Sequence, residues 1–199
     1  VGATWRRLAA DLAGWAASYI RESTPGYVDT KAHAADVVTD VDRAVERRVR
    51  EVLATECPTH VVVGEEEGGA SVAGIPTWYV DPLDGTTNFA AGLGWCSFSL
   101  ALAVDRVPVV AAVGDAIRGS VLSARAGHGT TLDGVPVRAR VPGPGTGTLS
   151  VTGGESGAGS LAGGVVLTEW AAHLPWPGME VFLRRLGEAC VTSRIMGSG

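Results

Sequence analysis

The chain has 199 residues, of which 46% are hydrophobic and 19% charged, and its formal net charge at pH 7 is −5. This composition is typical of a protein that buries a core, and it excludes an intrinsically disordered chain. Nonspecific nucleic-acid binding and binding to anionic membranes both need an excess of Lys and Arg. We therefore expect a folded protein that has neither nucleic acid nor a membrane as its partner.

The three cysteines, Cys57, Cys96 and Cys190, are odd in number, widely spaced and set in apolar stretches. This pattern disfavours both a disulfide framework and a thiolate metal site. The sequence also lacks a run of about 18 uncharged apolar residues, which a membrane-spanning helix needs. Charged residues interrupt the first segment, so no signal peptide is predicted. We expect reduced thiols and a cytoplasmic location.

Two helices are predicted in the first sixty residues. Apolar residues recur every three or four positions over residues 4–22, where Thr4 is available as the N-cap. The same period recurs in a second segment, in which Asp40 or Asp42 can cap a helix that ends before Pro58. Both segments are amphipathic, and each is expected to bury one face.

Short segments rich in β-branched residues follow, separated by Gly, Pro or Asp, and they predict strands. These segments are residues 61–63, 77–80, 96–104, 107–113 and 120–124. Two helices followed by a run of adjacent strands predict an α+β layered structure.

The composition changes between residues 142 and 164, where nine of 23 residues are Gly. Because Gly weakens both helices and strands, this stretch predicts a loop between domains. A strand, a helix and a second strand, expected over residues 165–169, 178–189 and 191–196, then predict the start of a βαβ unit. The predicted organisation is an N-terminal α+β domain over 1–143, a Gly-rich loop over 144–163, and the start of an incomplete α/β domain over 164–199.

The segment WYVDPLDGTTNF, residues 78–89, carries the most chemical information. Two carboxylates, Asp81 and Asp84, follow an apolar run, and Gly85 then allows a sharp turn. Small polar residues from Thr86 onward are suited to start a helix, whose free N–H groups can bind an anion. Mg²⁺ prefers a few carboxylates together with water and phosphate oxygens, so the segment predicts a magnesium and phosphate site. On its own, such a pattern is more often a turn capped by its aspartates.

Two other polar segments lie upstream of this one. Residues 64–66 read GEE directly after a predicted strand, where carboxylates can join a metal site, although an acidic run beside glycines is more often solvated. Residues 31–42 contain a Lys and the pattern DVVTDVD, which is also typical of a helix N-terminus with acidic residues at its positive end. Each segment alone is weak evidence for a site.

In their order along the chain, at residues 31–42, 64–66 and 78–89, the three segments together resemble the inositol monophosphatase family of metal-dependent, lithium-sensitive phosphatases. The stretch DPLDGTTNF matches the pattern of that family throughout. Further similarity covers residues 101–104, 123–129 and 133–137, and it continues more weakly from 167–169 to 194–198. The resemblance implies the layered α-β-α-β-α sandwich fold of sugar phosphatases.

The resemblance also implies a role for each matching residue. The metal ligands would be Glu65, Asp81, Asp84 and the backbone carbonyl of Leu83. Thr86, held by Asp42, would position the attacking water together with Glu65. The phosphate and the rest of the substrate would contact Asp84, Gly85, Thr86, Gly197 and Ser198, while Glu66 would lie outside the direct ligands.

The activity implied is hydrolysis of inositol monophosphate or a related polyol phosphate by metal-activated water. Two or three Mg²⁺ ions would activate that water and stabilise the leaving alkoxide, and Li⁺ would inhibit. The expected partner is a small phosphorylated polyol or sugar, and the expected assembly a homodimer. Histidinol phosphate, fructose 1,6-bisphosphate and a 3′-phosphonucleotide remain alternative substrates, and a non-catalytic scaffold with the same fold is the alternative of another class. Four clustered acidic and polar groups argue against a scaffold.

One family feature is absent from the sequence. The family carries a further metal-binding aspartate in a WDxAAG motif of its second domain, and no Trp-Asp pair occurs in these 199 residues. Because a chain that stops after a buried strand exposes half a core, we expect the natural protein to continue past Gly199.

Overall fold

The structure is a computed structural model, and it describes residues 2–30, 37–138, 165–168, 177–189 and 192–195. The described residues fall into two compact units, one up to Arg138 and the other from Val165 to Ile195. The predicted domain boundaries at 143/144 and 163/164 lie outside the described residues and stay predictions.

Helix α1 spans Gly2–Glu22 and buries a narrow stripe composed mainly of alanines. It begins before Thr4, so the prediction of Thr4 as N-cap is wrong, because that residue lies within the first turn. The small side chains let α1 approach the sheet closely. A Cβ atom on Gly114 of the sheet would lie 2.4 Å from the carbonyl oxygen of Ala13, which explains why glycine is needed there.

Helix α2 spans Asp40–Glu56, as its period predicts, but its N-cap is Thr39 rather than an aspartate. The Thr39 hydroxyl accepts from the backbone N of Val41 at 3.2 Å and of Asp42 at 3.4 Å. The Asp42 carboxylate in turn accepts from the backbone N of Thr39 at 2.9 Å. This reciprocal arrangement is a capping box, in which the third helical residue completes the cap. It holds the Asp42 side chain in one orientation.

A seven-stranded sheet forms the centre of the first unit, in the order β3-β4-β5-β6-β7-β8-β9. Its strands are β3 (Val61–Gly64), β4 (Thr77–Asp84), β5 (Ser97–Val104), β6 (Val107–Asp115), β7 (Ser120–Arg125), β8 (Thr130–Leu132) and β9 (Val135–Val137). The β3–β4 pair is parallel, and all other neighbours are antiparallel.

The five predicted strands are all present in this sheet, and β4 extends four residues further than predicted. Strands β8 and β9 were not predicted, nor were β1 (Val28–Thr30) and β2 (Val37–Thr39), which pair with each other. Each of these four strands has three residues, too few to show an alternating pattern.

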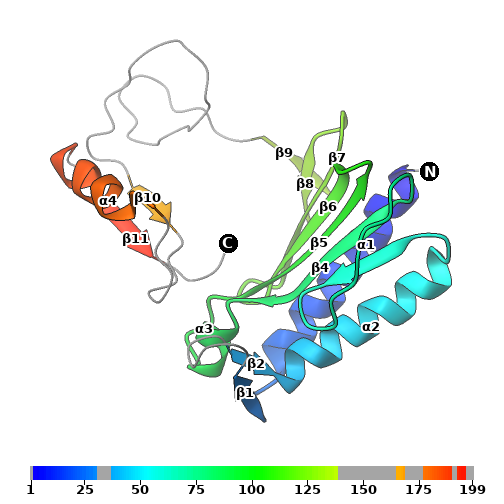
Figure 1. Ribbon diagram of the computed structural model, residues 1–199, viewed down its shortest axis with the longest axis horizontal. Helices are drawn as coiled ribbons and strands as arrows, with labels where there is room; N and C mark the ends of the chain where they lie inside the picture. The colour runs from blue at the N-terminus through cyan, green and yellow to red at the C-terminus, as the bar shows by residue number, and fades with distance from the viewer. Residues whose placement is uncertain (1, 31–36, 139–164, 169–176, 190–191, 196–199) are drawn as a thin grey trace. The chain divides into compact units, whose positions relative to one another are not determined.

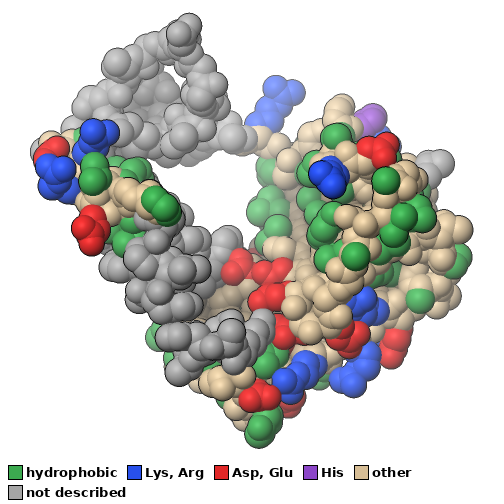
Figure 2. Space-filling model, in the orientation of Figure 1, with side chains coloured by type: hydrophobic (Ala, Val, Ile, Leu, Met, Phe, Trp, Pro, Cys, Tyr) green, Lys and Arg blue, Asp and Glu red, His purple; other side chains and the backbone are tan. Residues whose placement is uncertain are grey.

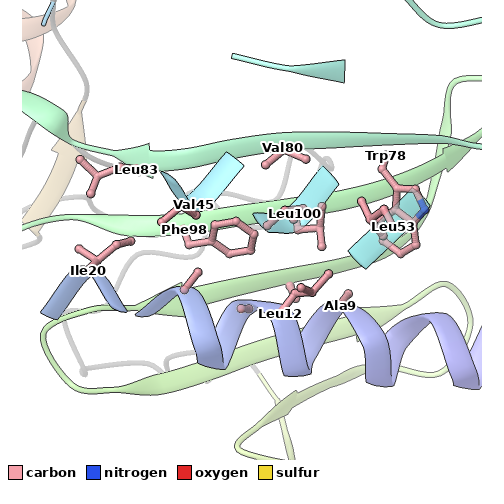
Figure 3. Close-up of a cluster of buried hydrophobic side chains, with 14 of the residues drawn as sticks. Ala9, Leu12, Ile20, Val45, Leu53, Trp78, Val80, Leu83, Phe98 and Leu100 are labelled. Carbon is pink, nitrogen blue, oxygen red and sulfur yellow. The ribbon is translucent and has the colours of Figure 1, made fainter. Parts of the chain in front are cut away.

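Helices α1 and α2 cover one face of the sheet (Figure 1). Figure 3 shows the core between these helices and the sheet. Side chains from α1 and α2 there contact Trp78 and Leu83 of β4 and Phe98 of β5. Trp78 and Phe98 are fully buried, and burial of each such side chain contributes about 2–3 kcal/mol. The packing of α2 against β4 brings together the segments that carry the predicted site residues.

The second unit contains β10 (Val165–Thr168), α4 (Met179–Glu188) and β11 (Thr192–Ile195). Strands β10 and β11 pair in parallel, as the predicted βαβ unit requires. Within the described part of the chain, none of the helices combines the length and apolar character needed to cross a bilayer. The predicted α+β layered class is confirmed.

Candidate metal and phosphate site

A β-bulge places Asp81 and Asp84 on the same face of the sheet. Asp81 pairs with Ser99 of β5, whereas Asp84 pairs with Ser97, so three steps along β4 match two steps along β5. In a regular strand, residues three apart point to opposite faces, and one extra residue restores them to one side. Pro82 and Leu83 lie in the irregular part, where proline breaks no regular ladder.

The short helix α3 (Thr86–Ala90) starts directly after this strand. Its N-cap, Gly85, has φ +90° and ψ +35°, which is the left-handed conformation that glycine adopts without strain. The predicted sharp turn is therefore present. It directs the backbone from the strand into the first turn of a helix beside the two aspartates.

Thr86 joins the DPLDGTT segment to α2. Its hydroxyl oxygen lies 2.9 Å from Oδ1 of Asp42 and 2.9 Å from the carbonyl oxygen of Leu83. Both partners are acceptors, so the single hydroxyl proton is shared between them. Asp42 is 1% exposed, and its other carboxylate oxygen is bound by the backbone N of Thr39. The structure thus places three predicted site residues in one contact network.

Glu65 lies at the end of β3, where its backbone N donates to the carbonyl oxygen of Val80 at 3.1 Å. This parallel contact sets Glu65 beside Asp81, and the two side chains share a hydrogen bond. Burial, then the charges of Glu65 and Asp84, raise the pKa of Asp81 from 3.8 to about 7. Because neighbouring carboxylates contribute to this raised pKa, Asp81 lies in a site of negative potential.

The thiol of Cys96, next to the start of β5, is affected by the same negative potential. Burial raises the pKa of its thiol, and the charges of Asp115, Asp84 and Asp42 raise it further. Figure 2 shows acidic side chains gathered over the end of the sheet from which β4 leads to α3. Cys96 and Cys57 are both buried free thiols, while Cys190 lies outside the described residues.

The donor set fits a hard divalent cation by its chemistry. Carboxylate and backbone carbonyl oxygens from Glu65, Asp81, Leu83 and Asp84 are the ligand types that Mg²⁺ takes in proteins. The neighbouring charges of Glu65 and Asp84 help to raise the pKa of Asp81, and a bound cation would relieve the same repulsion. Among the residues that the structure describes, no three Asp, Glu, His or Cys side chains converge closely enough to form a complete cation site.

A cavity of about 550 Å³ lies beside these carboxylates, and Glu65 and Asp81 are part of its wall. Tyr79 and Ser99 add polar groups, and the remaining wall is largely apolar. Of the other predicted site residues, Glu66 is half-buried in the loop after β3. Gly197 and Ser198 lie outside the described residues.

Glu46 is a residue that the sequence analysis missed. It lies one turn after Asp42 on α2, is fully buried, and binds the backbone N of Glu66 at 2.8 Å. In the sequence, Glu46 is one of several charged residues of an amphipathic helix. The only local signal was its spacing of four from Asp42, which places both on one face of the helix.

Comparisons with known proteins identify the family. The model of the inositol monophosphatase family matches residues 4–167. An inositol-1-monophosphatase of Synechocystis is 31% identical over 153 residues, which are 75% of this chain and 53% of that protein. The chain thus spans about half the length of the curated relatives it matches.

Solved structures share the fold. SuhB of Mycobacterium tuberculosis is 29% identical with a TM-score of 0.69, over 98% of this chain and 70% of that chain. An IMPase/NADP phosphatase complexed with Mg²⁺ and phosphate is 22% identical with a TM-score of 0.63, over 98% and 65%. Since the family model covers well over half of the sequence, the chain belongs to the inositol monophosphatase family.

Proposed function

We propose that this chain carries the metal and phosphate site of a Mg²⁺-dependent phosphatase that hydrolyses a small phosphate monoester. Inositol monophosphate or a related polyol phosphate is the proposed substrate. The observation that carries the proposal is the contact between Thr86 and Asp42, which lie 44 positions apart, beside the paired carboxylates of Glu65 and Asp81.

Glu65, Asp81, Asp84 and the carbonyl oxygen of Leu83 would supply part of the ligands for two or three Mg²⁺ ions. The solved relative with Mg²⁺ and phosphate supports this choice of ion for the family. Bound Mg²⁺ would lower the pKa of a water and neutralise the phosphoryl oxygens. Li⁺ is expected to inhibit, as the family resemblance implies.

Thr86 would orient the attacking water. When its hydroxyl donates to Asp42, the lone pairs of the same oxygen are available to accept a hydrogen bond from water. Glu65 would bind the second proton of that water, which aims the water oxygen at phosphorus. Asp42 stays fixed in this role because it is buried and completes the cap of α2.

Gly85 and Thr86 would bind the phosphate through their backbone N–H groups, with Asp84 nearby. Free N–H groups at the start of a helix favour anions. Attack by water would form one P–O bond while the ester P–O bond breaks. The water gives up one proton and the leaving alkoxide takes up one, so the products are the alcohol and inorganic phosphate. No side chain has to form a covalent phosphoenzyme.

Assembly and location are further proposals. A homodimer follows from the family resemblance, and a cytoplasmic location from the two buried free thiols, Cys57 and Cys96. Gly197 and Ser198 are proposed as substrate contacts on the same resemblance, and Glu66 as a residue just outside the metal ligands.

Phosphate release tests the proposal. The natural full-length protein with Mg²⁺ should release inorganic phosphate from inositol monophosphate faster than from histidinol phosphate, fructose 1,6-bisphosphate or a 3′-phosphonucleotide. Asp84→Asn should abolish release while the circular dichroism spectrum stays unchanged. Unchanged turnover in that variant would refute the metal assignment, and no release from any of the four esters would favour a scaffold.

A further inference from the structure

A buried carboxylate on α2 holds the loop that carries Glu65. Both oxygens of Glu46 face this loop, where they accept from the backbone N of Glu66 at 2.8 Å and of Glu67 at 3.1 Å. The Glu46 side chain is fully buried. A buried charge is costly unless it is paired and hydrogen-bonded, so these contacts are strong constraints on the loop.

Arg50, one turn further along α2, completes the arrangement. Its Nε donates to Oε1 of Glu46 at 2.8 Å. The same guanidinium reaches across the loop, where it donates to the carbonyl oxygens of Gly68 at 2.6 Å and Val62 at 3.4 Å. It therefore binds residues before and after Glu65, and a planar guanidinium does so with fixed directions.

The backbone of the loop is shaped for this contact. A Cβ atom built on Gly64 would lie 2.0 Å from Oε1 of Glu46, so only glycine lets the end of β3 pass this close to the carboxylate. Because Gly64 directly precedes Glu65, the position of Glu65 depends on the Glu46 carboxylate that Gly64 contacts.

Asp42 and Glu46 lie four residues apart and so share one face of α2. Asp42 binds Thr86, and Glu46 binds the loop of Glu65. These are the two segments from which the attacking water would be oriented. One rigid helix thus holds both segments at a fixed separation.

We propose that Glu46 and Arg50 are positioning residues that set Glu65 relative to Thr86 for metal binding and water attack. This inference rests on the proposed function. Neither side chain is proposed to touch metal or substrate, because Glu46 is saturated by the loop amides and Arg50. Their effect passes through the backbone of residues 64–68.

Glu46→Gln tests the proposal in the natural full-length protein. The variant keeps the side-chain shape but replaces one acceptor oxygen by an NH₂ group and removes the charge. Loss of such a supporting contact typically costs 10- to 100-fold in metal affinity, so the Mg²⁺ concentration at half-maximal rate should rise by about that factor. A purely structural role would lower the amount of folded enzyme, and with it the maximal rate, but would leave the half-saturating Mg²⁺ concentration unchanged.

Amide hydrogen exchange, followed by NMR in EDTA, gives a readout without activity. Exchange at the backbone N–H of Glu66 and Glu67 should accelerate about tenfold or more in Glu46→Gln, while exchange in β5 stays as in the wild type. Glu51→Gln is the matched control, since Glu51 lies on the same helix in an exposed ion pair with Arg48. That control should alter neither measurement.

Arg50→Gln is the second variant, because the side chain is partly exposed and its replacement disturbs the core less. It should change both measurements in the same direction, by smaller factors. Unchanged exchange at Glu66 and Glu67 in both variants, or an unchanged half-saturating Mg²⁺ concentration, would overturn the proposal. If the wild type releases no phosphate, the proposed function fails, and the exchange measurement still decides whether α2 holds the loop.

Discussion

Asp81→Asn is expected to stabilise the metal-free protein at alkaline pH. The carboxyl of Asp81 is buried next to Glu65 and Asp84, which raises its pKa to about 7 from 3.8. A raised pKa means that the folded protein binds this proton more tightly than the unfolded chain does. The resulting stability is fully present below pH 3.8 and is lost as the pH rises through about 7.

The size of the effect follows from the two pKa values. The difference between 3.8 and about 7 corresponds to about 4 kcal/mol of unfolding free energy. Because the side chain is only half-buried, solvent screening reduces this, and we expect about 1–2 kcal/mol. Asn cannot ionise, so the Asp81→Asn variant avoids the loss.

Urea unfolding in EDTA measures this effect at a series of pH values. The free energy of unfolding of Asp81→Asn minus that of the wild type should rise between pH 5 and pH 8. Asp11→Asn is the control, because Asp11 is exposed and forms a surface ion pair with Arg7, and its difference should stay flat over the same range. Added Mg²⁺ should reverse the order, since it stabilises only a protein that can bind it.

A pH-independent or destabilising effect of Asp81→Asn in EDTA would refute the reasoning. It would mean that the three carboxylates do not repel one another in the folded protein. The reasoning would also be refuted if the unfolding free energy of Asp81→Asn, relative to the wild type, changed with pH no more than that of Asp11→Asn.

Three other predictions concern the hydroxyl proposed to orient water, a partly buried histidine and the packing of the core. Thr86→Val should lower kcat about 100-fold, and Thr86→Ser should recover most of the rate, because only the hydroxyl is needed; steady-state phosphate release checks this. Burial lowers the pKa of His60 below 6.5, and Nδ1 of His60 accepts from Nε1 of Trp78 at 3.0 Å, so stability should decrease as the pH falls below about 6.5. His60→Gln should remove that part of the loss in melting temperature between pH 7 and pH 5, and an identical loss in the variant would contradict the assignment. Phe98→Ala should lower the free energy of unfolding by about 3–5 kcal/mol, seen as a lower urea midpoint, because the ring is fully buried.

The helices and the longer strands of the first unit could be predicted from local patterns. The period of three to four residues identified α1 and α2, and β-branched runs identified β3 to β7. The strands that were missed have three residues each, which is too short for a pattern. The N-cap of α2 was assigned to an aspartate because acidic residues are common there, whereas the structure uses Thr39 and makes Asp42 its reciprocal partner.

The local structure of the candidate site could also be predicted from the sequence, because two carboxylates, a sharp turn and a helix start follow one another in DPLDGTTNF. What the sequence could not provide was their arrangement. Asp81 and Asp84 share a face only because the β4–β5 pairing contains a bulge. Thr86 and Asp42 meet only because α2 packs on β4.

For Glu46, too, local sequence and tertiary packing determined different things. By itself, the sequence determined that a helix would form here and that Glu46 would share a face with Asp42, since both follow from local periodicity. Only the tertiary structure decided that this face is buried against the loop of Glu66 and Glu67, 20 residues away in the chain. A charged helical residue is ordinarily solvated, and Glu46 is buried only because it packs against a loop whose backbone N–H groups donate to its carboxylate.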